Sequence, residues 1–454
     1  MSKRFPGVRN LILLLGDIFI IIIMAYVAVG VVVSYSGVQL EMEVYNEMLP
    51  IMVIVAVILF NVNGLFSLTY KKYSEIIISL ALAMLNMLII MMAISFYLRE
   101  FSYSRSILLV AMLLQFIVLA GWKNFFWRIE DASVRPHNAL VIGNQVQCER
   151  IISRLNNQQN LRYHVKYACI ECGAEQWEAI AADIDLVIVC SDINVSDNAR
   201  IINFCHVHGK QVLIVPDFYE LFCSSVDLDT IDDIPVFRPR DLKPTLEQHM
   251  LKRMLDVIFS VGVLLCLWPV FVFVALAVKV DSPGPVFYSQ LRSGRYGKEF
   301  TIYKFRSMHQ DAETLSGPIM AAENDQRITS VGRFIRATRL DELPQFINVL
   351  IGDMSVVGPR PERPFFVAQF KEEIREYTYR HNVRPGITGL AQVCGKYNTT
   401  PRDKMIYDLI YIQKCNLVTD LVIMVQTLQV LVSKRSTEGI KGELIKTDLT
   451  KYQI

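Results

Sequence analysis

The feature that most constrains this sequence is a set of four long apolar stretches near its start, over residues 11–33, 50–66, 76–98 and 107–126. A helix that spans the hydrocarbon core of a bilayer needs about 20 apolar residues, and each stretch is close to that length. The chain of 454 residues is 52% hydrophobic and only 20% charged, which is typical of a membrane protein with sizeable soluble parts. We therefore predict a four-helix transmembrane bundle over residues 1–130.

The charges around these stretches indicate their orientation. Lys and Arg precede the first stretch, separate the second from the third and follow the fourth, whereas the first connection carries Glu41, Glu43 and Glu47. Positively charged flanks stay in the cytoplasm, so both ends of the bundle are expected there. A net charge of +2, with no long basic run, argues against nucleic acid as a partner.

The next segment, residues 135–240, alternates short apolar runs with helical patterns. Runs at 139–142, 165–170, 185–190 and 211–216 predict the strands of a parallel sheet in an α/β module. Its first turn keeps only Gly143, where a dinucleotide-binding fingerprint needs three glycines. We predict a degenerate, Rossmann-like nucleotide-binding module with a structural, regulatory or oligomerising role, and cofactor binding is the alternative. The module is a candidate surface for a homodimer.

Two adjacent carboxylates, Asp341 and Glu342, give the sequence its clearest chemical signal. They lie in the run RLDELPQ (residues 339–345), where Pro344 can occupy the first turn of a helix without losing a needed hydrogen bond. A helix N-terminus attracts phosphate groups, so a carboxylate nucleophile there would have a phosphate-binding platform beside it. The pattern favours phosphoryl transfer, although an isolated motif of this kind is more often an N-cap.

The surrounding motifs decide between these interpretations. From about residue 252 to residue 433 the chain resembles the bacterial sugar transferase family, the large monotopic phosphoglycosyl transferases. The motifs that carry the resemblance are FYSQLRSG (287–294), KFRSM (304–308), the carboxylate pair, GPRP (358–361) and VRPGITG (383–389). The resemblance implies an α-rich catalytic domain over residues 250–435, followed by a polar tail at 436–454.

The same resemblance implies a reaction and a location. Members of the family transfer a sugar 1-phosphate from a UDP-sugar to polyprenyl (undecaprenyl) phosphate and release UMP. A hexose such as glucose or galactose is the expected sugar, and the reaction is the first membrane step of exopolysaccharide, capsule or O-antigen assembly. The expected location is the bacterial cytoplasmic (inner) membrane, with the catalytic domain facing the cytoplasm.

A fifth apolar stretch at residues 251–280 decides the geometry of that domain. Four earlier crossings return the chain to the cytoplasm, so a fifth full crossing would place the carboxylates outside the cell, where nucleotide sugars are not found. Lys252, Arg253 and Lys279 flank the stretch with charges of one sign, and Pro269 lies near its middle, where proline disrupts helical hydrogen bonding. We predict a re-entrant membrane hairpin that breaks at Pro269, with a kinked transmembrane span as the alternative.

Cations in the catalytic segment are candidates for binding a diphosphate, because guanidinium groups match phosphate oxygens. Within the resemblance's motifs, the predicted phosphate-binding residues are Arg306, Arg360, Arg384, Lys304 and Arg292. Arg295 and Lys298 surround a glycine-rich turn, and a further group of basic residues leads toward the carboxylate pair: Arg327, Arg333, Arg336 and Arg339. Each of these could equally be a solvated or lipid-facing charge.

The resemblance implies a covalent mechanism. Asp341 would attack the β-phosphorus of the UDP-sugar, and polyprenyl phosphate would then take the phosphosugar from Asp341. Mg²⁺ is the expected cofactor, with Asp341 and Glu342 as candidate ligands, and Glu342 is either a metal ligand or a proton acceptor. The alternatives are a membrane-anchored nucleotide-sugar dehydratase or epimerase, which would need an intact glycine fingerprint and a Tyr-x-x-x-Lys motif, and a non-enzymatic membrane scaffold.

Overall fold

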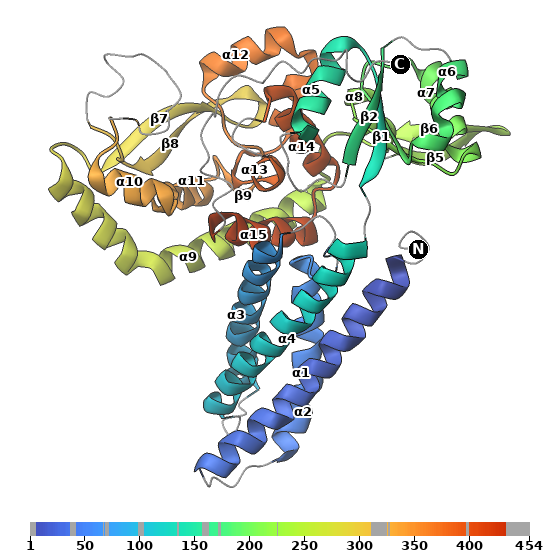
Figure 1. Cartoon of the computed structure of the whole chain (residues 1–454). Coiled ribbons are helices and arrows are strands. Elements are labelled where there is room, and N and C mark those ends of the chain that lie inside the picture. The colour runs from blue at the N-terminus through green and yellow to red at the C-terminus, as the bar shows by residue number, and fades with distance from the viewer. Residues whose placement is uncertain are drawn as a thin grey trace. The chain divides into compact units, whose positions relative to one another are not determined.

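The computed structural model describes residues 6–36, 42–66, 68, 72–98, 104–133, 136–156, 163–170, 174–224, 226–309, 325, 327–395 and 399–432 (Figure 1). The described residues divide into two compact units, one within residues 1–215 and the other within residues 216–443. Most of the regular structure is helical. The predicted polar tail, 436–454, lies outside the described residues.

Four apolar helices begin the first unit: α1 (Pro6–Ser36), α2 (Met42–Val62), α3 (Tyr73–Tyr97) and α4 (Arg105–Ser133). By length and composition, each is able to cross a membrane. They pack side by side, with α1 against α2 and α4, and α3 against α2 and α4. The four predicted helices are confirmed.

A buried ion pair holds two of these helices together. The Lys123 ammonium of α4 lies 2.5 Å from the Asp17 carboxylate of α1 and also donates to the Leu65 carbonyl at 3.0 Å. A charge in an apolar interior is stable only when it is paired and hydrogen-bonded. The burial of each residue is therefore possible because the other carries the opposite charge. Asp17 therefore has a partner within the bundle.

The α/β part of the first unit contains one parallel sheet in the order β2-β1-β3-β4. Its strands are β1 (His137–Ile142), β2 (Tyr163–Cys169), β3 (Leu186–Val189) and β4 (Gln211–Ile214), and its helices are α5 (Gln145–Asn156), α6 (Ala174–Ile180), η1 (Ala181–Asp183) and α7 (Val195–Val207). Helix α5 packs in one hydrophobic cluster, and α6 and α7 pack in another. The predicted parallel sheet is confirmed.

The second unit begins at residue 216. It opens with α8 (Phe218–Ser224) and an antiparallel hairpin of β5 (Val226–Ile231) and β6 (Ile234–Pro239). Helix α8 packs through Leu221 into the core of this unit, which explains why it belongs there.

The long helix α9 (Leu246–Asp281) follows the hairpin. Thr245 and Gln248 form a capping box at its start, which satisfies two backbone N–H groups that would otherwise lack partners. The helix continues through Pro269 and bends along its length without reversing direction (Figure 1). The predicted break at Pro269 is therefore a bend in one continuous helix, because proline can kink a helix without ending it.

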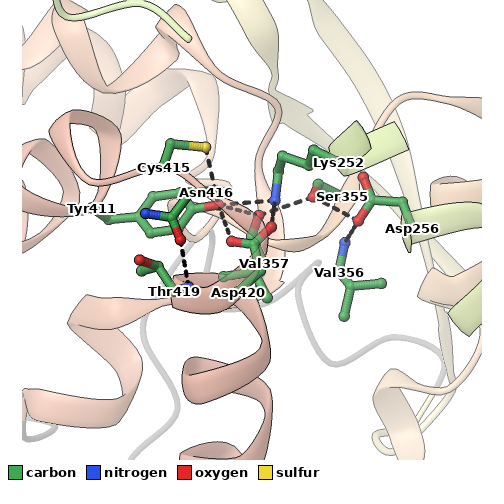
Figure 2. Close-up of polar contacts among 10 residues, drawn as sticks. All are labelled: Lys252, Asp256, Ser355, Val356, Val357, Tyr411, Cys415, Asn416, Thr419 and Asp420. Atoms are coloured by element: carbon green, nitrogen blue, oxygen red, sulfur yellow. Dashed lines mark hydrogen bonds and ion pairs between the residues drawn. The ribbon is translucent and has the colours of Figure 1, made fainter. Parts of the chain in front are cut away.

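Both halves of α9 pack on the second unit. In the first half, Lys252 lies 2.6 Å from Asp420 and donates to the Tyr411 hydroxyl (Figure 2). One turn further on, Asp256 accepts from Ser355 Oγ and from the Val356 N–H, both at 2.9 Å. In the second half, Val274 and Val278 pack in a hydrophobic cluster with Phe305 and Ile335.

The middle of α9 is exposed. The side chains of Leu265, Trp268 and Phe273 are between 63% and 72% exposed. A helix whose two halves are held by one compact unit therefore leaves a large apolar surface uncovered.

The remaining elements build the domain around α9. They are β7 (Phe287–Ser293), η2 (Arg295–Gly297), β8 (Glu299–Phe305), α10 (Ser330–Ala337), η3 (Leu340–Glu342), α11 (Gln345–Ile351), β9 (Ser355–Val357), α12 (Pro364–Glu373), η4 (Arg375–Asn382), β10 (Gly386–Thr388), α13 (Leu390–Cys394), α14 (Pro401–Gln413) and α15 (Leu417–Val432). Strands β7 and β8 form an antiparallel hairpin, and β9 pairs in parallel with β10.

Candidate active site

Asp341 and Glu342 lie together on η3, a short 3₁₀ turn between α10 and α11. Arg339 precedes the turn in the left-handed region, at φ 59°, which costs a non-glycine residue roughly 1–2 kcal/mol. This turn ends α10 and leads the chain toward α11, and both carboxylate residues are buried at 9% exposure. The local structure thus places two acids inside the domain.

Glu342 is surrounded by cations. Its Oε1 atom accepts from Lys304 Nζ and from an Arg360 guanidinium nitrogen, each at 3.2 Å, and lies 3.7 Å from Arg339. Burial alone would raise the pKa of Glu342, but Lys304, Arg360 and Arg339 together hold that pKa well below its usual range. Glu342 is therefore ionised and neutralised by its neighbours.

Asp341 has the opposite environment. Burial, and then the negative charge of Glu342, raise the pKa of Asp341 to about 6, although Lys304 and Arg336 act against this rise. Its Oδ1 atom is buried and has no hydrogen-bond partner among the described residues. A buried acceptor without a partner is unusual and marks a position where a ligand or ion can bind.

The two acids carry oxygen donors of the type that Mg²⁺ prefers. No group of three or more His, Cys, Asp or Glu side chains that could hold a metal occurs among the described residues. Mg²⁺ is nevertheless commonly held by one or two carboxylates together with substrate phosphates. Asp341 Oδ1 is an oxygen donor of the right kind, so the donor set is compatible with an ion completed by substrate.

Three of the five predicted phosphate-binding residues lie at or beside the pair. Lys304 and Arg360 contact Glu342 directly. Arg292 donates to the carbonyl of Pro361, the residue after Arg360, at 3.4 Å, and burial and then the charge of Arg360 lower the pKa of Arg292 to about 10.

Arg336 and Arg339, which precede the pair in the sequence, also act on it. Arg339 lies 3.7 Å from Glu342, and the charge of Arg336 lowers the pKa of Asp341. Their position in the sequence just before the pair is what indicates this role.

The other two predicted residues lie in different surroundings. Arg306 donates to the carbonyls of Ser282 and Pro283, at 2.6 and 2.7 Å, and so closes the C-terminal end of α9. Arg384 donates from Nε to the Gly352 carbonyl at 2.8 Å, just after α11. In the structure both guanidinium groups donate to backbone carbonyls, and a motif does not reveal which carbonyls a buried guanidinium satisfies.

A pocket adjoins Arg360. It is lined by Ser293, Gly294, Pro359, Arg360, Pro361, Arg380, His381, Val383 and Pro385. In its wall, Arg380 pairs with the buried Asp408 at 2.9 Å and donates to the Arg360 carbonyl at 2.9 Å. Arg380 therefore fixes the backbone from which Arg360 reaches Glu342, a role that sequence analysis missed because Arg380 lies outside the recognised motifs.

Glycines allow the two strands beside this pocket to approach closely. A Cβ atom on Gly386 would lie 2.1 Å from the Gly358 backbone N, and one on Gly358 would lie 2.4 Å from the Arg384 carbonyl oxygen. No side chain fits at such distances. These motif glycines serve backbone packing between β9 and β10.

The first turn of the α/β module is filled by its own side chains. Asp192 accepts from the Asn144 N–H at 2.6 Å, and Asn144 Oδ1 accepts from the Gln147 N–H at 2.9 Å in the first turn of α5. A carboxylate thus occupies the kind of position where a dinucleotide's pyrophosphate binds in the intact motif. The second unit holds the stronger candidate site.

The fold and site define a class of protein: one with several apolar helices and a buried, cation-lined carboxylate pair. Residues 247–434 match the model of the family described as "Bacterial sugar transferase". Exopolysaccharide production protein PSS of Rhizobium leguminosarum bv. phaseoli is 44% identical over 180 residues, which are 38% of this chain and 90% of that protein. The chain belongs to the bacterial sugar transferase family.

Longer relatives are also similar. A UDP-glucose:undecaprenyl-phosphate glucose-1-phosphate transferase of Escherichia coli (strain K12) is 39% identical over 239 residues, 51% of each chain. A UDP-N-acetylgalactosamine-undecaprenyl-phosphate N-acetylgalactosaminephosphotransferase of Aeromonas hydrophila is 36% identical over 266 residues, 58% of this chain and 61% of that protein. The chain thus matches only about half to three fifths of the length of these two relatives.

Proposed function

We propose that this protein transfers a hexose 1-phosphate from a UDP-sugar to undecaprenyl phosphate and releases UMP, in the assembly of a surface polysaccharide. The observation that carries the proposal is the division of roles at η3, where Glu342 is neutralised by cations and Asp341 keeps a buried oxygen without a partner. The printed names of the relatives support the same class of substrates.

In the proposed mechanism, Asp341 is the nucleophile. One carboxylate oxygen attacks the β-phosphorus, the bond to the bridging oxygen breaks, and UMP leaves with the electron pair. The phosphosugar remains on Asp341 as an acyl phosphate. An oxygen of undecaprenyl phosphate then attacks the same phosphorus, which regenerates the carboxylate and forms the lipid diphosphate sugar.

The surrounding side chains lower the cost of bringing anions together. Arg360 and Lys304 are placed to bind phosphate oxygens, and Arg292 adds positive charge beside Arg360. Glu342 holds Lys304 and Arg360 at the site and is the second candidate ligand for the ion. When bound, Mg²⁺ would neutralise phosphate charge. We assign Asp341 and Glu342 as its ligands.

We further propose that α9 enters and leaves the membrane through one leaflet. Both halves of the helix pack on the same compact unit, and its exposed apolar middle needs a nonpolar environment. A full crossing would place the two ends on opposite sides of about 30 Å of hydrocarbon. With the bundle of residues 1–130 returning the chain to the cytoplasm, this arrangement keeps the catalytic domain, residues 250–435, on the cytoplasmic face.

The function is tested by supplying the purified full chain with undecaprenyl phosphate, Mg²⁺ and, in turn, UDP-glucose, UDP-galactose and UDP-N-acetylgalactosamine. We expect lipid-dependent release of UMP with at least one sugar, together with a lipid-linked sugar product. The three sugars also identify which hexose is accepted. UMP release with none of them, when an active relative works in the same assay, would contradict the proposed reaction for these substrates.

A further inference from the structure

A second group of basic residues lies around the start of α9. It comprises His249, Arg253, Arg295 and Arg384, which we call the α9 basic cluster. Arg295 donates to His249 Nε2, and Arg253 and Arg384 meet at Gly352: Arg384 donates to its carbonyl, and Arg253 lies 3.6 Å from the position of a Cβ atom there. The cluster thus draws residues from α9, η2 and the start of the VRPGITG motif.

Two buried donors of this cluster have no partner among the residues that the structure describes. Because Arg295 donates to Nε2, His249 carries its proton on Nδ1, and that buried Nδ1 has no acceptor among the described residues. The buried Nε of Arg295 also has none. Buried N–H groups are nearly always satisfied in folded proteins, so these donors indicate an acceptor supplied from outside the chain.

The charge in the cluster is not balanced by nearby acids. Burial lowers the pKa of Arg384, and the positive charges of Arg253 and Arg295 lower it further, with Asp256 and Asp353 opposing this less strongly. Asp256 is already engaged with Ser355 and Val356. Arg253 donates to the Val349 and Leu350 carbonyls at 2.6 and 2.8 Å, and Arg384 donates to the Gly352 carbonyl, so the C-terminal end of α11 offsets part of this charge. No carboxylate pairs with these guanidinium groups among the described residues, and an added anion would complete the neutralisation.

This cluster is centred away from the carboxylate pair, although Gly294 and Pro385, next to Arg295 and Arg384 in the chain, line the pocket that adjoins Arg360. Arg295 lies in the turn between β7 and β8, beyond the Ser293–Glu299 pair, whereas Lys304 lies five residues along β8 from Glu299. A strand rises about 3.3 Å per residue, so roughly 17 Å of strand separates Lys304 from that turn. A phosphate bound at Asp341 does not reach the α9 basic cluster.

The side chains around the cluster indicate which kind of molecule would carry the bound anion. Met250 and Met254, one turn apart on α9, are 65% and 61% exposed beside Arg253. This is the boundary where the polar first turn of α9 gives way to its apolar stretch. Basic groups at such a boundary bind the phosphates of lipid headgroups.

From these observations we infer that the α9 basic cluster is a binding site for the phosphate of an anionic membrane lipid, distinct from the site that carries Asp341. The lipid's acyl chains would lie along the exposed apolar side chains of α9. The site anchors the start of α9 at the membrane surface and does not depend on the transfer reaction.

The test is native mass spectrometry of the detergent-purified full chain, titrated with phosphatidylglycerol and, separately, with phosphatidylcholine. We expect preferential binding of phosphatidylglycerol, weakened about tenfold or more in Arg295→Gln and in Arg384→Gln, because each removes a charge-assisted hydrogen bond. Arg295→Lys should retain part of the binding. Lys298→Gln, an exposed charge in the same β7–β8 turn, is the matched control and should bind as the parent does.

Inorganic phosphate alone is the second arm of the test. Displacement of phosphatidylglycerol by millimolar phosphate would support the anion site and show that the phosphate group suffices, whereas resistance to displacement would support recognition of the whole lipid. Thermal unfolding of each variant checks its fold, and Arg295→Gln, on a surface turn, remains informative if Arg384→Gln is unstable. Equal binding of both lipids by the parent, or loss of preference only with Lys298→Gln, would overturn the inference.

Discussion

Replacing Arg380 with Met should destabilise the catalytic unit strongly. The Arg380 guanidinium and the Asp408 carboxylate lie 2.9 Å apart with side-chain exposures of 5% and 2%, and Arg380 also contacts the Tyr377 hydroxyl. Removing one partner leaves a buried, unpaired charge, which costs about 3–5 kcal/mol. A domain of this size loses roughly 2–4 °C per kcal/mol, so the unfolding midpoint should fall by roughly 6–20 °C.

The assay is thermal unfolding of the purified full chain in detergent. The double variant Arg380→Met/Asp408→Leu removes both charges and should recover most of the lost stability, since an apolar pair of similar volume is often tolerated. Arg375→Met, an exposed residue at the start of η4, is the matched control and should change the midpoint little. A fall of less than about 3 °C in Arg380→Met would refute the account of this pair.

The double variant also separates stability from positioning. Arg380 donates to the Arg360 carbonyl, so a folded protein without it should hold Arg360 less firmly. The loss of one hydrogen bond from a charged donor costs about 1.5–3 kcal/mol. If that cost is paid in the transition state, kcat/KM for the UDP-sugar should fall roughly tenfold or more. Unchanged kcat/KM in the folded double variant would show that Arg380 does not position Arg360.

Three further outcomes follow from the site. Because the pKa of Asp341 is raised to about 6, the ionised nucleophile is lost as pH falls. The rate of single-turnover UMP release should therefore drop about tenfold per pH unit below that value. A rate that is independent of pH between about 5 and 7 would contradict this expectation. Arg306→Gln should lower stability by about 1–3 kcal/mol, measured by denaturant unfolding, because α9 loses its C-terminal donors; a fully stable variant unable to bind UDP-sugar would instead favour the predicted phosphate contact. Removing divalent ions with EDTA should abolish UMP release and added Mg²⁺ should restore it, whereas activity unaffected by EDTA would exclude the proposed ion.

Features with a local cause were predictable from the sequence. The four apolar helices follow from hydrophobic length, and the parallel sheet follows from short apolar runs separated by helical patterns. The proximity of Lys304 and Arg360 to Glu342 agrees with their places in the motifs. Such signals need no knowledge of how distant segments meet.

Features that depend on distant contacts were harder to predict. Arg306 and Arg384 have the same residue type and the same kind of motif context as Arg360, yet they satisfy backbone carbonyls after α9 and α11. The continuity of α9 through Pro269 depends on packing along both halves of the helix. The division at residue 215 reflects the packing of Leu221 in the core of the second unit. Composition and motif spacing carry none of this information.

The most direct test of the central claim is the mass of the covalent adduct. The purified protein is incubated with UDP-sugar and Mg²⁺ in the absence of undecaprenyl phosphate, and its tryptic peptides are analysed by mass spectrometry. We expect a phosphosugar on the peptide that contains Asp341, absent in Asp341→Asn, present in the control Asp353→Asn, and removed when undecaprenyl phosphate is added. Lipid-dependent UMP release by the parent protein with no adduct at any residue, or an adduct that persists in Asp341→Asn, would contradict it.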